Sequence, residues 1–150
     1  MGKNFTKDKS EALYNKFRDW RDKLLDLQNS IIIIEGKRDL AVLKQLGVQE
    51  ISNTVIMYSQ KSFIEVEEFL HEEENKDKQV IPLVDFDRQG EEYLKEIESM
   101  TNKVDLELRF DLRNMTRGKL QEFEDLLYLL KSKLHPNYWL VLCQTLNLTL

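Results

Sequence analysis

The sequence predicts an α/β fold in which helices flank a parallel sheet. The first observation is a run of four isoleucines, Ile31 to Ile34. Four consecutive β-branched residues cannot lie on one stripe of an amphipathic helix, and they are typical of a strand buried on both faces. The second observation is that residues 80–84 repeat this design, because a short apolar run is followed by acidic residues, a glycine and a helical pattern. Short strands alternating with helical patterns predict parallel pairing, with helices on both faces of the sheet.

Residues 5–29 precede the first strand and predict a long amphipathic helix. Its apolar residues recur at helical spacing between charged residues. They are Leu13, Phe17, Trp20, Leu24 and Leu27. We expect this helix to pack on the sheet or on a second copy of the chain. The alternative is a contact with nucleic acid through its basic residues, namely Lys16, Arg18 and Arg21.

Four strands and three helices are predicted in the central part of the chain. The strands cover residues 30–34, 54–57, 80–84 and 104–108, and the helices cover residues 38–46, 63–71 and 90–100. Gly47 suits the C-terminal cap of the first of these helices. Pro82 is tolerated in the third strand only where its missing N–H is not needed. This order predicts a four-stranded parallel sheet.

The pattern changes beyond Phe110. A short helical turn near residues 112–115, a second amphipathic helix over residues 120–130 and a short apolar helix over residues 138–146 are predicted. We therefore divide the chain into an N-terminal helical extension (1–29), a central domain (30–113) and a C-terminal helical extension (114–150). The aromatic pair Tyr138 and Trp139 suggests a homodimer formed through these extensions.

Composition excludes several classes of protein. The net charge of −5, from 22 basic and 27 acidic residues, argues against a protein that coats nucleic acid by charge alone. No apolar run approaches the roughly 20 residues that a membrane span needs, so we expect no membrane partner. The single cysteine, Cys143, excludes disulfides within the chain and zinc ribbons. A reducing cytoplasm is the expected location.

Acidic residues follow two of the predicted strands. Glu35 and Gly36 come directly after the first strand, and Asp85 and Asp87 come directly after the third. In an extended chain residues two apart project to the same side, so the two aspartates should converge. Ligands bind beyond the carboxyl ends of parallel strands, and we expect all three carboxylates to cluster at that edge. Oxygen ligands without histidine or thiolate favour Mg²⁺, with Mn²⁺ as a substitute.

These motifs resemble those of the Toprim domain. A hydrophobic strand ending in Glu35-Gly36, with Asp39 shortly after, and a later strand ending in Asp85-x-Asp87-x-x-Gly90 are similar to its two signature motifs. This domain occurs in type IA and type II topoisomerases, bacterial-type primases, OLD-family nucleases and RNase M5. The resemblance covers about residues 31–113 and is greatest to the small stand-alone Toprim proteins of archaea. It implies a Rossmann-like sheet of four parallel strands.

The resemblance also implies roles for individual residues. Glu35 matches the Toprim glutamate, which acts as general acid or base or helps to bind metal. Asp85 and Asp87 match the metal-binding pair, and Gly36 and Gly90 match the turn glycines. Gly36 should allow a tight turn and close approach by a ligand.

Asp39 has two interpretations. It is either a further metal ligand or a structural carboxylate, which the dipole favours in the first turn of a helix. Basic residues that lie beyond the strand ends should bind phosphate or nucleic acid, because a guanidinium group pairs with two phosphate oxygens at once. They are Lys37, Arg38, Arg88, Arg109 and Arg113. For Arg88 the alternative is a surface ion pair with Glu91 or Glu92. We expect Lys131 and Lys133, farther along the chain, not to contribute.

Two classes of function fit this pattern. The first is a Mg²⁺-dependent enzyme that acts on phosphodiester bonds, most simply a nuclease resembling the RNase M5 type and involved in RNA processing. The second is a non-catalytic or partner-dependent module that binds RNA or DNA through the same face. Haloacid-dehalogenase phosphatases also carry Asp-x-Asp after a strand, but they have threonine where this chain has Gln89. We expect neither topoisomerase nor complete primase activity, because the chain has no supporting tyrosine or zinc motif.

Overall fold

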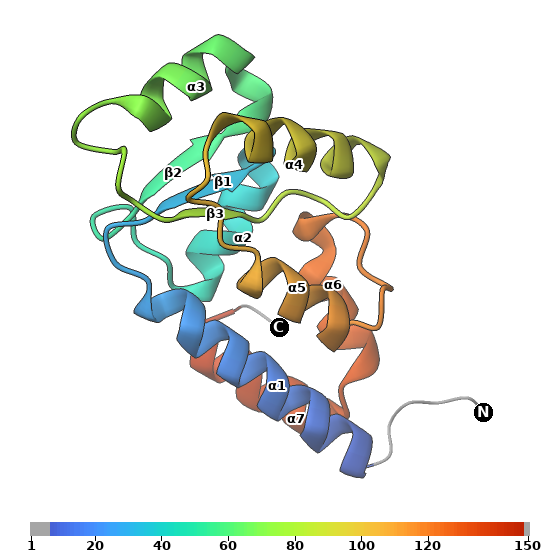
Figure 1. The fold of residues 1–150 in the computed structure, drawn as a ribbon. Helices are drawn as coiled ribbons and strands as arrows, with labels where there is room; N and C mark the ends of the chain where they lie inside the picture. The colour runs from blue at the N-terminus through green and yellow to red at the C-terminus, as the bar shows by residue number, and fades with distance from the viewer. Residues whose placement is uncertain (1–6, 149–150) are drawn as a thin grey trace.

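The computed structural model describes residues 7–148 and contains a three-stranded parallel sheet with strand order β2-β1-β3 (Figure 1). The strands are β1 (Ile31–Ile34), β2 (Thr54–Met57) and β3 (Val80–Pro82). The helices are α1 (Lys7–Asp26), α2 (Lys37–Leu46), α3 (Phe63–His71), α4 (Arg88–Met100), α5 (Glu107–Met115), α6 (Leu126–Lys133) and α7 (Pro136–Leu146). Two 3₁₀ turns, η1 (Tyr58–Gln60) and η2 (Phe123–Asp125), complete the described elements. The predicted α/β class with a parallel sheet is therefore confirmed.

The prediction of a fourth strand over residues 104–108 is wrong. Val104 makes only a single parallel bridge to Val80, and among the described residues the sheet has three strands. The chain leaves the sheet because Asp105 Oδ1 accepts a hydrogen bond from Glu107 N at 2.9 Å, at the start of α5. Leu108 and Leu112 then repeat at helical spacing and are buried. Helical packing of these side chains overrides the β-branched start of the segment.

Other boundaries differ by a few residues. Helix α3 and strand β2 have the predicted bounds, whereas β3 ends at Pro82 and α4 begins at Arg88, two residues earlier than expected. The helix expected over residues 120–130 is divided into η2 and α6. Helix α1 runs from Lys7 to Asp26, and Phe5, where we expected it to begin, lies outside the described residues.

The isoleucines of β1 divide between two apolar layers. Ile31 and Ile33 face a cluster formed with α3 and α4, while Ile32 and Ile34 face a second cluster formed with α1, α2 and α5 to α7. All four side chains are 0% exposed. Figure 1 shows α3 and α4 on one side of the sheet and the remaining helices on the other. The strand is thus buried on both faces, as the isoleucine run indicated.

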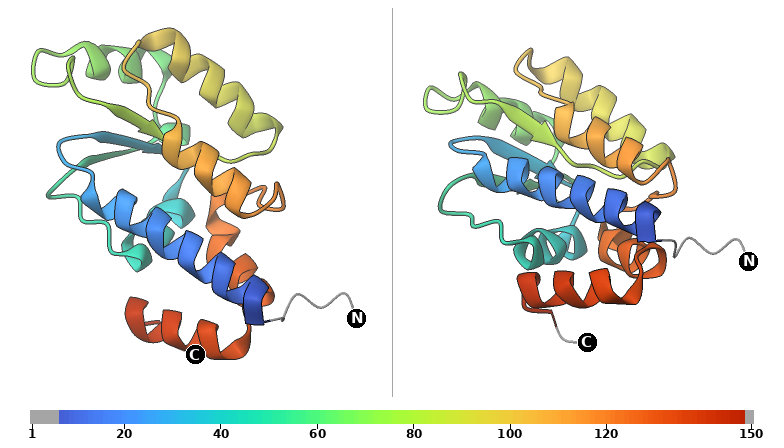
Figure 2. Two further views of the ribbon diagram at one scale, coloured as in Figure 1. Left: turned by 60° about the horizontal axis from the view of Figure 1, so that its bottom comes forward. Right: turned by 90° about the horizontal axis from the view of Figure 1, so that it is seen from below.

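The two helical extensions pack on the central domain. Trp20 Nε1 on α1 donates a hydrogen bond to Leu108 O on α5 at 2.8 Å. Helix α7 lies along α1 (Figure 2), and the rings of Tyr14 and Tyr138 are 5.4 Å apart. Tyr138 and Trp139 are partly buried against the core, so this aromatic pair packs within the chain. Homodimerisation stays a prediction.

No helix in the described part of the chain combines the length and apolar character required to cross a bilayer.

Candidate metal centre

Three carboxylates meet at the carboxyl edge of the sheet. Glu35 follows β1 directly, and Asp85 and Asp87 lie between β3 and α4. One oxygen from each residue lies within 4.8 Å of the corresponding oxygens of the other two. The clustering expected from the sequence is therefore confirmed.

Backbone N–H groups orient each member of this acidic cluster. Glu35 Oε2 accepts a hydrogen bond from Asp85 N at 2.9 Å, which ties the ends of β1 and β3 together. Asp85 Oδ1 accepts from Phe123 N at 2.7 Å, and Asp87 Oδ1 accepts from Gly90 N at 2.9 Å as the N-cap of α4. These bonds hold the three carboxylates in one place, although their charges repel one another.

The cluster has the dimensions of a small cation site. Mg²⁺ binds oxygen at about 2.0–2.1 Å, so two oxygens on opposite sides of one ion are about 4.2 Å apart. The oxygens of Glu35, Asp85 and Asp87 lie within 4.8 Å of one another, so small side-chain rotations would bring them to one ion. An all-carboxylate donor set is typical of Mg²⁺ or Mn²⁺. The residues present therefore fit a divalent cation.

Burial and mutual repulsion raise two pKa values in the cluster. The pKa of Asp85 rises to about 7, first because the group is buried and then because of the charges of Glu35, Asp39 and Asp87, while Phe123 N–H opposes the shift. Burial likewise raises the pKa of Glu35, and a hydrogen bond from the Asp85 N–H opposes that shift. A bound cation would relieve this repulsion and favour the ionised forms.

The two motif glycines serve different purposes. A Cβ atom at Gly90 would lie 1.9 Å from Asp85 O and 2.4 Å from its carbonyl carbon, so α4 can approach Asp85 only because residue 90 lacks a side chain. Gly36 has an extended backbone with φ −157°, which any residue adopts, and a Cβ atom there would meet only Ser59 Oγ, at 3.6 Å. The predicted tight turn therefore does not depend on glycine at position 36, but the backbone there is open to a ligand.

Asp39 lies beside the cluster but outside it. Its Oδ2 accepts hydrogen bonds from Glu35 N and Gly36 N, both at 3.2 Å, and it is 5% exposed. Burial raises the pKa of Asp39, and these N–H groups oppose the shift. Among the described residues, the cluster of potential ligands does not include Asp39. The geometry gives this residue a structural role, which is to fix the turn between β1 and α2.

Arg109 is buried rather than displayed at the surface. It is 6% exposed, and its guanidinium group donates to Val84 O at 3.2 Å and to Asp85 O at 2.7 Å. The same group pairs with Glu91 at 2.7 Å and lies 4.5 Å from the centre of the Phe86 ring. These contacts occupy the guanidinium group, so we remove Arg109 from the predicted phosphate-binding set. It holds the segment that carries Asp85.

The other predicted phosphate-binding residues are exposed: Lys37, Arg38, Arg88 and Arg113. Arg38 makes an ion pair with Glu124 at 3.7 Å, and Arg88 pairs with Glu92 at 3.5 Å. The two arginine side chains are 86% and 94% exposed, so these pairs are weak and leave the cations available to a ligand.

Sequence reasoning missed the segment that completes the cluster from the C-terminal extension. Phe86 N donates to Gln121 O at 2.7 Å, beside the bond from Phe123 N to Asp85. Nothing in the sequence marks these backbone groups, because any residue can supply an N–H or a carbonyl. Burial and the charge of Glu35 raise the pKa of Tyr93 on α4, a residue to which the sequence assigned no role.

A parallel α/β fold with a glutamate and an Asp-x-Asp pair at its strand ends defines a class of proteins with a carboxylate site for a divalent cation. The Toprim domain family matches residues 30–114, more than half of the chain. The chain therefore belongs to the Toprim domain family.

Its relatives include small archaeal proteins. The chain is 33% identical to a UPF0292 protein of Pyrococcus furiosus over 129 residues, which is 84% of this chain and 92% of that protein. A UPF0292 protein of Pyrococcus horikoshii is 32% identical over the same shares, and one of Methanosarcina barkeri is 30% identical over 74% of this chain and 77% of that protein. No solved structure gives a significant match.

Proposed function

We propose that this Toprim protein is a Mg²⁺-dependent enzyme that cleaves phosphodiester bonds in nucleic acid, similar to the RNase M5 type of nuclease. The observation that carries the proposal is the convergence of Glu35, Asp85 and Asp87 within 4.8 Å. Three buried or half-buried carboxylates are a costly arrangement without a cation, and Mg²⁺ completes its coordination shell with substrate phosphate. Nuclease chemistry uses both properties.

The roles follow from the contacts of each residue. Asp85 and Asp87 would hold the cation, which when bound supplies charge stabilisation at a phosphate oxygen. Glu35 would act as the general acid or base, because its raised pKa brings its proton exchange closer to neutral pH. Lys37, Arg38 and Arg88 are exposed residues near the cluster in sequence and would contact the phosphate backbone.

The test is an assay with labelled single-stranded RNA and DNA in Mg²⁺ or in EDTA. We expect cleavage in Mg²⁺ and none in EDTA. Glu35→Gln should lower the rate by about 10²–10⁴-fold, the usual contribution of a general acid or base. Lys44→Gln, an exposed change on α2, serves as the control and should keep the wild-type rate.

Two outcomes would contradict the proposal. Cleavage that Glu35→Gln leaves unchanged would show that the acidic cluster does not perform it. Mg²⁺-dependent binding of RNA or DNA without any cleavage would identify the chain as a non-catalytic or partner-dependent module, the second function that the sequence allows.

A further inference from the structure

A pocket lies between the two helical extensions, on residues that the acidic cluster does not use. It has a volume of about 350 Å³, within the range of small-ligand sites. We call it the basic pocket. It is lined by Lys9, Ala12, Leu13 and Lys16 of α1, by Met115, Thr116, Arg117 and Lys119 at and after the end of α5, and by Leu129, Leu130 and Lys133 of α6.

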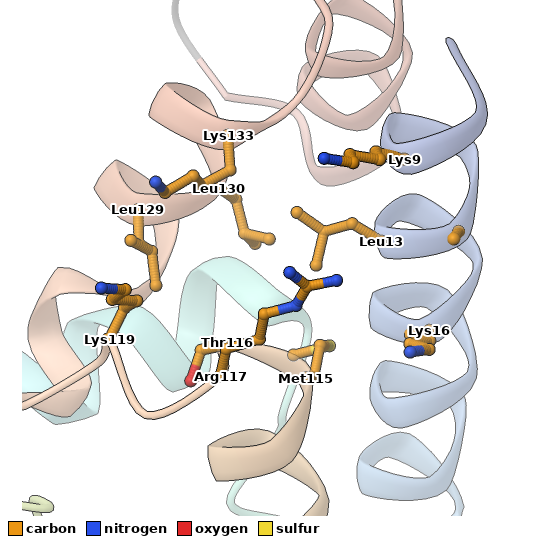
Figure 3. Close-up of a pocket in the computed structure, with 11 residues that line it drawn as sticks. Lys9, Leu13, Lys16, Met115, Thr116, Arg117, Lys119, Leu129, Leu130 and Lys133 are labelled. Carbon is orange, nitrogen blue, oxygen red and sulfur yellow. The ribbon is translucent and has the colours of Figure 1, made fainter. Parts of the chain in front are cut away.

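The lining combines positive charge with an apolar floor. Five of these residues are Lys or Arg, and none of the described lining residues is Asp or Glu, although the chain as a whole is acidic. Figure 3 shows Leu13 and Leu130 facing each other across the pocket, with the Arg117 guanidinium group reaching toward Leu13. Such a lining complements a ligand that carries negative charges on an apolar body.

The cations are spread too widely for a single phosphate group. Lys9 and Lys16 are seven residues apart on α1, which places them about 10 Å apart along the helix axis. Arg117, Lys119 and Lys133 line the pocket from two other segments. A chain of several phosphates fits this spacing. The pocket volume of about 350 Å³ has room for part of a flexible single strand but not for a duplex.

The loop that lines this pocket also supports the acidic cluster. Lys119 lies two residues before Gln121, at most about 7 Å along an extended chain, and Gln121 O accepts a hydrogen bond from Phe86 N. Phe123 N, two residues further on, binds Asp85. The same loop therefore connects the acidic cluster with the basic pocket.

Arg117 supports a binding role because its backbone is disfavoured. It has φ +53°, in the left-handed region that favours glycine or asparagine, and Gly118 follows with φ +71°. The side chain is exposed and lines the pocket. Arginine does not favour this backbone conformation, so its contribution at position 117 is the guanidinium group.

We propose that the basic pocket holds part of the single-stranded nucleic acid whose phosphodiester bond lies at the acidic cluster. The phosphates contact the lysines and Arg117, and a base or sugar packs on Leu13 and Leu130. This inference rests on the proposed function and adds the extensions to the nucleic-acid surface. It replaces the expectation that Lys133 takes no part, and it assigns Lys16 the contact that the sequence left open. Arg21 is excluded from the nucleic-acid contact, because it does not line the pocket and its Nε donates to Leu46 O at 2.7 Å.

The experiment measures binding of short fluorescent single-stranded RNA and DNA by anisotropy, in EDTA so that cleavage does not interfere. The pocket variant is Lys16→Glu with Lys133→Glu. The control is Arg18→Glu with Lys131→Glu, exposed residues on the same two helices that do not line the pocket. Each pair removes two positive charges and adds two negative charges, so both change the net charge from −5 to −9.

We expect the control to bind like the wild type and the pocket variant to bind at least about tenfold more weakly. The slope of affinity against salt should fall by about 0.7 for each phosphate that the variant no longer neutralises. Arg117→Asn should also weaken binding while keeping or raising the melting temperature, because asparagine tolerates the left-handed backbone. That combination separates binding from stability.

Each other outcome has a definite meaning. Equal binding by the pocket and control variants overturns the pocket and leaves the proposed function standing. Pocket-dependent binding without cleavage in Mg²⁺ keeps the pocket and overturns the nuclease. Binding of ATP by the wild type but not by the pocket variant, without binding of either oligonucleotide, overturns the nucleic-acid strand and assigns the pocket to a small phosphorylated ligand.

Discussion

Replacing Asp85 with asparagine should stabilise the metal-free protein while abolishing its response to metal. Asp85 is 9% exposed and its pKa is raised to about 7 from an ordinary value of 3.8. A carboxyl group whose pKa is raised in the folded state binds more protons there than in the unfolded state. The free energy of unfolding therefore falls as pH rises from about 4 to about 7, and the whole loss is present above pH 7. Asparagine removes the charge but keeps the oxygen that accepts the hydrogen bond from Phe123 N.

The magnitude follows from the pKa difference. About three pKa units at 1.36 kcal/mol each give a ceiling of about 4 kcal/mol above pH 7. Even half of this would raise the melting temperature by roughly 4–8 °C for a chain of this length. The assay is thermal unfolding at pH 8 in EDTA and again with Mg²⁺ or Mn²⁺, which should raise the melting temperature of the wild type only. If Asp85→Asn melts below the wild type in EDTA, or still responds to metal, the reasoning about the cluster is refuted.

Three further predictions, two of them with a control substitution, test the groups around the cluster. Gly90→Ala should lower the free energy of unfolding in urea by about 3 kcal/mol, because the new Cβ atom would meet Asp85 O. Gly36→Ala introduces only an ordinary contact and should lower it far less. Equal losses in the two variants would contradict this prediction. Arg109→Met should lower the free energy of unfolding by about 3 kcal/mol, since two backbone carbonyls lose their donor. Arg88→Met should change this free energy little. A larger loss for Arg88→Met than for Arg109→Met would make Arg88 the structural residue. Asp39→Asn should keep the rise in melting temperature with Mn²⁺, whereas loss of that rise would make Asp39 a metal ligand.

The sequence carried the parts of the fold that depend on local pattern. Four consecutive isoleucines specify a strand buried on both faces, and α3 begins at the predicted residue because Ser62 and Glu65 form a capping box. The fourth strand could not be excluded in this way. Apolar and acidic residues alternate over residues 104–108, which predicts a strand, whereas packing of Leu108 and Leu112 favours a helix in the structure.

The site residues were predictable only where the fold itself fixes their position. Carboxylates at the ends of parallel strands are brought together by the sheet itself, so Glu35, Asp85 and Asp87 could be expected to meet. The arginines had no such constraint. Arg109 follows a predicted strand, as Arg88 does, but α5 turns it inward to three oxygen acceptors and the face of Phe86. Charge alone does not tell a surface cation from one that holds a backbone segment.

The acidic cluster also depends on residues beyond the Toprim match, which ends at residue 114. The N–H group that binds Asp85 belongs to Phe123, and the side chain of Phe123 is 0% exposed in the core. The bond is therefore fixed by packing of the C-terminal extension, which in turn contacts α1 through α7. Because the same extension lines the basic pocket, a single segment, residues 116–123, carries both the N–H group that binds Asp85 and two of the five cations, Arg117 and Lys119. The C-terminal extension therefore contributes both to the support of the acidic cluster and to the lining of the basic pocket.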